Sequence, residues 1–429
     1  MTDWKVVKLD DVADLSGGYA FKSSQYTQSG RFVLRTVNID DQFSITRENS
    51  NFIDENEARE FDRFALREHD TLFVMVAATL GKIGYVRARD LPALLNQNMW
   101  VIRAKAGAID PIFLHYLFRE ISKIPLSWVG GSARSFLRRD DVRKLEFKLP
   151  DEDEQRAIAN VLKCLDDKIE LNRRMNETLE EMARALFRDW FVDFGPTRRQ
   201  MEGATDPVAV MGGAFPVEKA ATLAPLFPAA FGDDGLPEGW SHSNVGTEFD
   251  VVMGQSPPGH TYNERGEGLP FFQGRRDFGF RFPSRRVFCT DPKRVSESDW
   301  TLLSVRAPVG DINRSAEKCA IGRGVGAFLH KAGLHSFTYY TGLALRAELK
   351  SYDKDGTVFG SINQKQFRGL EVVVPDKGLA IHFDEVVAPM DDKIRLNTEE
   401  SETLAEMRDL LLPKLMSGEV RVGSVEAAG

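Results

Sequence analysis

The chain contains one seven-residue sequence twice. DDKIELN occupies residues 166–172 and DDKIRLN occupies residues 391–397, so six of the seven residues are identical at a separation of 225 positions. Further identities keep this separation without gaps across residues 143–186 and 368–411. A gap-free register is typical of a rigid helix, because one inserted residue would rotate its faces by about 100°. Internal repetition on this scale predicts two copies of one architectural unit.

Both copies carry the seam of a coiled coil, since seam residues recur at alternating steps of four and three. Around the repeated sequence the seam positions are Ile169, Asn172, Asn176 and Leu179, and then Ile394, Asn397, Ser401 and Leu404. Two helices of about 40 residues would each be about 60 Å long, and they would cover their seams by packing on each other. If they run antiparallel, the polar layers at mid-seam meet and fix the register. An ordinary pair of amphipathic core helices is the alternative.

Each helix follows a segment that is rich in short β-type runs, such as RFVLRTVNI at residues 31–39 and LEVVVP at residues 370–375. These segments repeat more loosely, with Trp4 aligned to Trp240 at a different separation, as expected where loops have diverged. We therefore expect an α+β protein. Two mixed α/β domains in tandem repeat would be separated by two long helices, packed as an antiparallel coiled coil with pseudo-two-fold symmetry.

The expected boundaries follow the repeat and the composition. Asp151, with Glu154 three residues later, predicts the start of the first helix. The stretch before Trp240 is rich in Gly, Pro and Ala, which predicts a partly ordered linker. The segments are a first domain at 1–150, a helical region at 151–194, the linker at 195–235, a second domain at 236–375, a second helical region at 376–416 and a C-terminal tail at 417–429.

The net charge of −8 is unevenly distributed. Residues 1–150 carry +2 and residues 240–375 carry +4, whereas the remainder, which includes both helices, carries −14. The two β-rich domains are therefore the parts suited to phosphate contact. The three cysteines are not closely spaced, and the first residues lack an apolar signal core, so we expect a reducing cytoplasm.

The sequence contains no complete catalytic or cofactor-binding motif of the following kinds. An adenine methyltransferase needs Asn/Asp-Pro-Pro-aromatic to hold a flipped base, but residues 110–113 read DPIF and residues 256–259 read SPPG. No GxxxxGK[ST] phosphate loop occurs, and the seven histidines never pair at ligand spacing. IGRGVG at residues 321–326 lacks the surrounding strand and helix of a dinucleotide site. The sequence therefore predicts a chain that recognises a partner and catalyses nothing.

Taken together, these features resemble the specificity subunit of type I restriction–modification systems. The resemblance is carried by LPDEDEQRAIANVLKCLDDKIELNRRMNETLEEMARALFRDWFVDFGP, by its shorter echo at residues 374–420, by GYAFKSSQY from Gly18, and by MGQSPPGHTYNERGEGLPFFQG at residues 253–274. One departure is visible, because Leu379-Ala380 stands where the first helix has Glu154-Gln155.

The resemblance implies two target recognition domains that each read one half of a bipartite site in double-stranded DNA. The helices would form the spacer and bind two modification (methyltransferase) subunits, which restriction (motor and nuclease) subunits join. S-adenosylmethionine, ATP and Mg²⁺ would be bound by those partners, and this chain would hold no cofactor. Membranes play no part in this interpretation.

The predicted DNA contacts are basic or amide side chains in loops of the two domains. They are Lys22, Arg134, Arg138 and Arg139 in the first domain, and Gln273, Arg275, Arg276, Arg281, Arg285 and Arg286 in the second. Gln97 and Asn98 are further amide readers if they are exposed, with burial in a strand as the alternative. For the second domain the alternative is a core of phenylalanines with a solvated arginine face.

Two other functions remain open at this point. A coiled-coil adaptor would join proteins and touch no nucleic acid, and a self-contained DNA methyltransferase would use unfamiliar motifs. Salt-dependent DNA binding separates the first from our interpretation, and binding of S-adenosylmethionine by the isolated chain would support the second.

Overall fold

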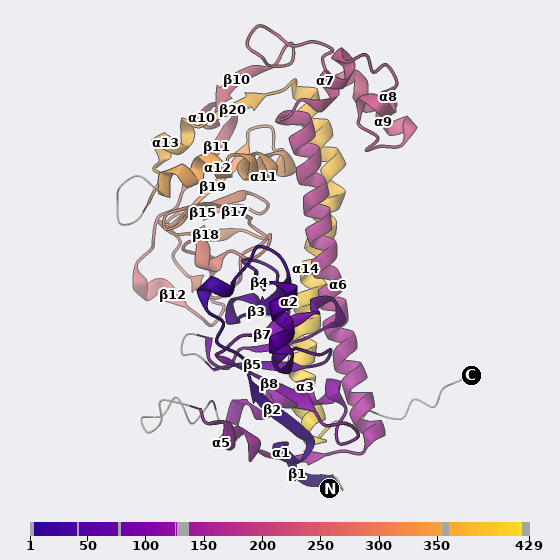
Figure 1. Cartoon of the computed structure of the whole chain (residues 1–429). Helices are drawn as coiled ribbons and strands as arrows, with labels where there is room; N and C mark the ends of the chain where they lie inside the picture. Colours follow the sequence, from indigo (N-terminus) through magenta and orange to yellow (C-terminus); the bar gives the residue numbers. More distant parts are fainter. Residues whose placement is uncertain are drawn as a thin grey trace, which may run out of the picture. The chain divides into compact units, whose positions relative to one another are not determined.

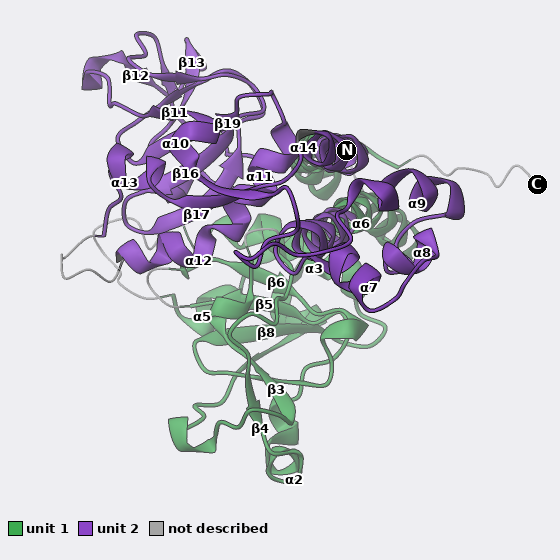
Figure 2. Cartoon of the chain, turned by 90° about the horizontal axis from the view of Figure 1, so that it is seen from above, with its two compact units in different colours: residues 1–172, 399–429 green, residues 173–398 purple. Residues whose placement is uncertain are grey.

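The computed structural model describes residues 4–40, 43–75, 79–124, 126, 137–353 and 360–422. Figure 1 labels its helices and strands. The chain divides into two compact units, which Figure 2 shows in different colours. Unit 1 comprises residues 1–172 and 399–429, and unit 2 comprises residues 173–398.

Unit 1 is built on a four-stranded sheet in the order β2-β8-β5-β6 and a three-stranded sheet in the order β4-β3-β7, with β1 and β9 paired separately. Its strands are β1 Lys5–Lys8, β2 Ala13–Gly17, β3 Arg31–Leu34, β4 Asn51–Ile53, β5 Thr71–Val74, β6 Ile83–Tyr85, β7 Ala93–Leu95, β8 Met99–Ala104 and β9 Glu146–Leu149. Its short helices are α1 Leu9–Val12, α2 Glu55–Ala58, α3 Pro111–Ile121 and α5 Arg139–Arg143. Asp110 caps α3 by accepting hydrogen bonds from the backbone of Ile112 and Phe113.

Unit 2 repeats this topology, since its four-stranded sheet has the order β11-β19-β16-β17 and its second sheet contains β14-β13-β18. Its strands are β10 Ser241–Asn244, β11 Phe249–Met253, β12 Tyr262–Asn263, β13 Leu269–Phe272, β14 Phe288–Cys289, β15 Val295–Ser296, β16 Thr301–Val305, β17 Val309–Arg314, β18 Cys319–Ile321, β19 Val325–His330 and β20 Glu371–Val374. The equivalent helices are α10 Val245–Glu248, α11 His335–Ala344 and α13 Gln364–Arg368, and α12 Arg346–Leu349 is additional. The predicted tandem repeat of two mixed α/β domains is confirmed.

Two long helices complete the units: α6 Glu152–Phe191 and α14 Lys377–Ser417. Asp151 accepts a hydrogen bond from the Glu154 backbone at the start of α6, as the sequence predicts. α14 runs through Pro389, which must remove one helical hydrogen bond. Phe383, Val387 and Ile394 on either side are fully buried, so tertiary packing outweighs the local cost of the proline.

The two helices are antiparallel within each unit. In unit 1, Asp166 pairs with Arg408, and Asn172 farther along α6 pairs with Glu400. In unit 2, Asn176 bonds to Asn397, and farther along α6 the ring of Phe187 lies 5.5 Å from that of Phe383. Residue numbers rise on α6 as they fall on α14, which confirms the predicted orientation.

The polar seam layers meet as the repeat requires. The Asn172 amide donates to Ser401 Oγ at 3.3 Å in unit 1, and the Asn397 amide donates to Asn176 Oδ1 at 2.9 Å in unit 2. Ile169, Ile394 and the three asparagines are buried, while Leu179, Ser401 and Leu404 are half-buried.

Asn397→Leu is expected to lower the urea midpoint of unit 2, because it removes a partner of the buried Asn176 amide, at a cost of about 1–3 kcal/mol. Equilibrium unfolding followed by circular dichroism measures this. The double variant Asn176→Leu/Asn397→Leu should recover most of the loss, since neither amide is then left unpaired. A double variant less stable than Asn397→Leu alone would contradict the assignment of this layer.

The segment predicted as a linker holds three short helices: α7 Gly195–Met201, α8 Pro207–Val210 and α9 Val217–Leu223. Val210, Leu223 and Phe227 are buried in the same hydrophobic cluster as Trp190 of α6. This packing explains why a stretch rich in Gly, Pro and Ala carries regular structure.

Candidate nucleic-acid interface

Each unit brings a glycine against the turn that joins two of its strands. A Cβ on Gly18 would lie 2.0 Å from the Asn96 carbonyl oxygen, and a Cβ on Gly254 would lie 2.2 Å from the Gly322 carbonyl oxygen. Only glycine permits this approach. The two turns, between β7 and β8 and between β18 and β19, are thus held beside the segments that follow Gly18 and Gly254.

In unit 2 the loop after β13 presents Gln273, Arg275 and Arg276 to solvent. The buried carboxylate of Asp277 accepts hydrogen bonds from the backbone of Gln273 at 2.6 Å and of Gly274 at 3.3 Å, so it fixes the loop from below. Arg276 has no ion pair among the described residues, whereas Arg275 pairs with Asp311 at 2.7 Å. The loop therefore offers polar side chains on a rigid backbone, which is what direct readout of base edges requires.

Two more predicted arginines of unit 2 lie on the surface but pair with acids. Arg285 contacts Glu317 at 2.5 Å, and Arg286 contacts Asp277. Their side chains remain 58% and 41% exposed, so both stay accessible to a phosphate.

Arg281 was predicted to contact DNA, and that prediction is wrong. The residue is 1% exposed. Its guanidinium donates to Asp391 at 2.8 Å, to Glu180 at 3.2 Å and to the Tyr340 hydroxyl at 2.9 Å, and it lies 3.9 Å from the Tyr339 ring centroid. An arginine buried among these partners joins the β-rich domain of unit 2 to its helices and is not accessible to a phosphate.

In unit 1, Lys22 and Arg138 are exposed at the starts of short helical segments. Arg139 is exposed and its guanidinium lies 6.0 Å from the Trp100 ring centroid. Arg134 lies outside the described residues. The segment that was predicted to carry Arg134, Arg138 and Arg139 is thus described only from residue 137 onward.

The turns beside Gly18 and Gly254 carry side chains that the sequence left undecided or missed. Gln97 and Asn98 are exposed in the β7–β8 turn, so the alternative of burial in a strand does not apply to them. Arg323 is exposed in the equivalent β18–β19 turn and was not predicted. The signal was the alternation of glycines in IGRGVG, since a Cβ on Gly324 would lie 2.1 Å from the Gln273 carbonyl oxygen. Those glycines serve a tight turn beside the β13 loop.

The first aspartate of each repeated sequence ties its domain to the helix. Asp166 accepts hydrogen bonds from the Tyr116 hydroxyl at 2.8 Å and from Arg408 at 2.7 Å. Its equivalent Asp391 accepts from Ser336 at 2.7 Å and from Tyr340 at 3.2 Å. Burial raises the pKa of both tyrosines, so their hydroxyls stay protonated and donate. These aspartates therefore support the domains and do not face a ligand.

The one residue that differs between DDKIELN and DDKIRLN reverses an ion pair. Glu170 contacts Arg89 at 2.6 Å in unit 1, whereas Arg395 contacts Asp299 in unit 2. In each unit the helix residue has the charge opposite to that of its partner in the β-rich domain. The substitution within the repeat is thus matched to the domain that the helix supports.

Within the described ranges, no group of three or more His, Cys, Asp or Glu residues is arranged to hold a metal ion. No helix in this part of the chain is long and apolar enough to cross a membrane.

Residues 1–181 match the family model for the type I restriction modification DNA specificity domain. A Methanocaldococcus jannaschii protein described as the MjaX specificity subunit is 25% identical, over 98% of this chain and 94% of its own length. The chain resembles a type I specificity subunit over nearly its whole length. The HindI specificity subunit of Haemophilus influenzae is 24% identical over 83% of this chain and 87% of that protein. The specificity subunit structure from M. genitalium, at 18% identity and a TM-score of 0.56, covers 96% of each chain and shares the fold. The predicted resemblance to type I specificity subunits is confirmed.

Proposed function

We propose that this chain is the sequence-specific DNA-recognition and scaffold subunit of a type I restriction–modification complex. Each β-rich domain reads one half of a bipartite target in double-stranded DNA. The antiparallel helices set the spacer and bind the methyltransferase subunits, to which restriction subunits are added. The chain itself catalyses nothing in this proposal.

The observation that carries the proposal is the repeated topology. Two domains with the same sheet order each end in one member of the helix pair. Each domain also presents polar side chains on a loop or turn held by close backbone approach, among them Gln97 in unit 1 and Gln273 and Arg323 in unit 2. Two copies of one recognition domain suit a bipartite target, because each domain then recognises one half-site and the two half-site sequences can differ independently.

Partner binding is supported by apolar side chains that are exposed at equivalent positions of both helices. Leu171 and Leu396 are 53% and 59% exposed, and Met182 and Met407 are 50% and 48% exposed. Each pair is separated by the 225 positions of the repeat. Large apolar residues repeated on a solvent-facing helix suit a protein surface that docks there, and two matched sets suit two copies of one partner.

The chemistry of the complex would come from those partners. S-adenosylmethionine would be bound by the methyltransferase subunits, and ATP and Mg²⁺ by the restriction subunits. The proposed location of the complex is the cytoplasm, where the DNA target and these partners occur together.

Salt titration of DNA binding tests the proposal. The complex of this chain with methyltransferase subunits should bind its preferred bipartite site with an affinity that falls steeply as salt rises, because phosphate contacts release counterions. A flat dependence would support the adaptor function in place of ours. Binding of S-adenosylmethionine by this chain alone would support the methyltransferase function.

Arg276→Ala/Arg323→Ala is expected to weaken binding to the preferred site by at least about 30-fold, since each side chain that reads a base contributes about 1–3 kcal/mol and the variant removes two. Fluorescence anisotropy with the full complex measures the change. Arg198→Ala/Lys219→Ala, which removes two exposed cations from the segment between α6 and β10, is the matched control and should leave the affinity unaltered. Equal losses in both variants would argue against readout by the β13 loop and the β18–β19 turn.

A further inference from the structure

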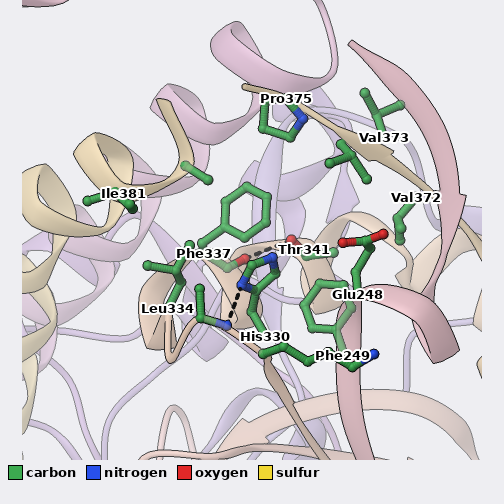
Figure 3. A pocket seen from close by; sticks show the side chains of 14 residues that line it. Glu248, Phe249, His330, Leu334, Phe337, Thr341, Val372, Val373, Pro375 and Ile381 are labelled. Atoms are coloured by element: carbon green, nitrogen blue, oxygen red, sulfur yellow. Dashed lines mark hydrogen bonds between the residues drawn. The ribbon is translucent and has the colours of Figure 1, made fainter. Parts of the chain in front are cut away.

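Unit 2 contains a pocket of about 400 Å³ beside the start of α14. Figure 3 shows Phe337 of α11 and His330 of β19 facing it, with Ile381 of α14 and Val372 of β20 on either side. Most of its walls are apolar. Leu334, Pro375 and Ala380 also line it.

The equivalent place in unit 1 is filled by a glutamine of the chain itself. Gln155 is buried, and its side-chain amide donates to the Pro150 carbonyl oxygen at 2.9 Å. The amide oxygen of Gln155 accepts a hydrogen bond from the Asp110 backbone at 2.8 Å. A primary carboxamide therefore bridges the end of the last strand and the residue before α3.

In unit 2 this bridge is missing. The repeat places Ala380 at the position of Gln155, Pro375 at that of Pro150, and Leu334, the residue before α11, at that of Asp110. Among the described residues, neither the Leu334 N–H nor the Pro375 carbonyl oxygen has a hydrogen-bond partner. The departure Leu379-Ala380 thus opens the pocket and leaves unpaired the two backbone groups that a carboxamide joins in unit 1.

The same exchange removes a second polar contact nearby. The Trp4 indole donates to Glu154 at 2.9 Å in unit 1. Leu379 stands at the position of Glu154, and the buried indole nitrogen of Trp240, the equivalent of Trp4, has no partner among the described residues. Three hydrogen bonds of unit 1, two made by Gln155 and one by Glu154, are therefore absent at this end of unit 2.

We propose that this pocket binds the side chain of a glutamine from a partner polypeptide. The amide oxygen accepts from the Leu334 N–H and the amide nitrogen donates to the Pro375 carbonyl oxygen, as Gln155 does in unit 1. Phe249, Phe337 and Val372 enclose the methylene groups and one neighbouring apolar side chain, because the pocket is larger than a single glutamine side chain.

The lining favours an uncharged amide that belongs to a polypeptide. Burial lowers the pKa of His330, so its imidazole is neutral at pH 7 and offers no charge to a carboxylate. Glu248 and Lys331 also line the pocket, but the Glu248 carboxylate accepts a hydrogen bond from Ser243 at 2.7 Å and the Lys331 ammonium donates to the Thr247 carbonyl oxygen. Free glutamine would have to compete with these contacts or place its ammonium and carboxylate groups against apolar walls, which is costly unless they are paired. The binding site is separate from the side chains that we assign to DNA recognition.

The test follows the Leu334 amide by NMR in the full-length chain labelled with ¹⁵N-leucine, where Leu334→Ile identifies the peak. Acetyl-Ala-Gln-Leu-N-methylamide should shift this peak saturably, and the Met and Glu versions of the peptide should bind at least about tenfold more weakly. Ala380→Gln should abolish the shift by filling the pocket. Ala405→Gln, the same substitution elsewhere on α14, should leave it intact.

Four results would overturn the proposal. Equal binding of the Gln and Met peptides would show an apolar groove without amide recognition. If free glutamine bound as tightly as the peptide, the ligand would be the free amino acid and not a glutamine of a partner polypeptide. No shift with any peptide, or an undiminished shift in Ala380→Gln, would show that the pocket is not the binding site. None of these results bears on DNA recognition, so failure here and failure of the proposed function are distinguishable.

Discussion

Arg281→Met is expected to lower the free energy of unfolding of unit 2 by about 3–5 kcal/mol, the usual cost of removing one member of a buried ion pair. The substitution leaves Glu180 and Asp391, at 9% and 4% exposure, with less of the positive charge that now compensates them. It also removes the guanidinium that joins residues of α6, α11 and α14. Urea unfolding of the full-length chain, followed by circular dichroism, measures the loss.

Arg276→Met is the matched control, because it makes the same change on an exposed arginine of the same segment. A surface substitution of this kind usually alters stability by no more than about 0.5 kcal/mol. The two variants should behave in opposite ways, with Arg281→Met affecting stability and Arg276→Met affecting DNA binding. If the Arg281→Met protein were stable but bound DNA poorly, Arg281 would be a DNA contact after all and its structural role would be contradicted.

Glu170→Arg is expected to destabilise unit 1 by about 2 kcal/mol. The pair that it breaks is a hydrogen-bonded ion pair with Arg89 at 2.6 Å, and a hydrogen bond to a charged group is worth about 1.5–3 kcal/mol. The new arginine would also face Arg89 with the same charge. Because the Arg89 side chain is 31% exposed, solvent screens part of this repulsion. Thermal unfolding of the full chain detects the change.

The charge exchange Arg89→Glu/Glu170→Arg tests whether polarity is what matters at this position. It should regain part of the lost stability, though not all, because the glutamate introduced at position 89 would then lie next to Asp90, which is buried. Glu170→Gln, which removes the charge without reversing it, should fall between the natural chain and Glu170→Arg. A double variant as unstable as Glu170→Arg would show that the reversal between DDKIELN and DDKIRLN is incidental.

The sequence predicted the helices well because their information is local and periodic. Seam positions such as Asn176 and Asn397 recur at fixed steps, and an antiparallel pairing was the arrangement that brought the polar layers together. The same reasoning located the start of α6 at Asp151. It also identified the departure at Leu379-Ala380, whose structural consequence is the pocket of unit 2.

The candidate DNA contacts were harder to predict, because exposure depends on tertiary packing that a local pattern does not contain. Arg281 and Arg285 lie four residues apart in one arginine-rich segment, yet one is buried and the other is exposed. The acids that pair with Arg281 are distant in sequence, at Glu180 and Asp391. Arg323 was missed because its flanking glycines were assessed for cofactor binding and not as a turn between strands.

The central claim is that two copies of one reader each recognise half of a target, and exchanging one reader tests it most directly. Residues 236–375 can be replaced by the corresponding segment of another type I specificity subunit, keeping Arg281 and Asp299 so that the contacts to the helices persist. The target is then determined by selection from random DNA with the methyltransferase complex. We predict that one half of the recognised sequence changes while the other half and the spacer length stay the same. A change in both halves, or in neither, would contradict the account.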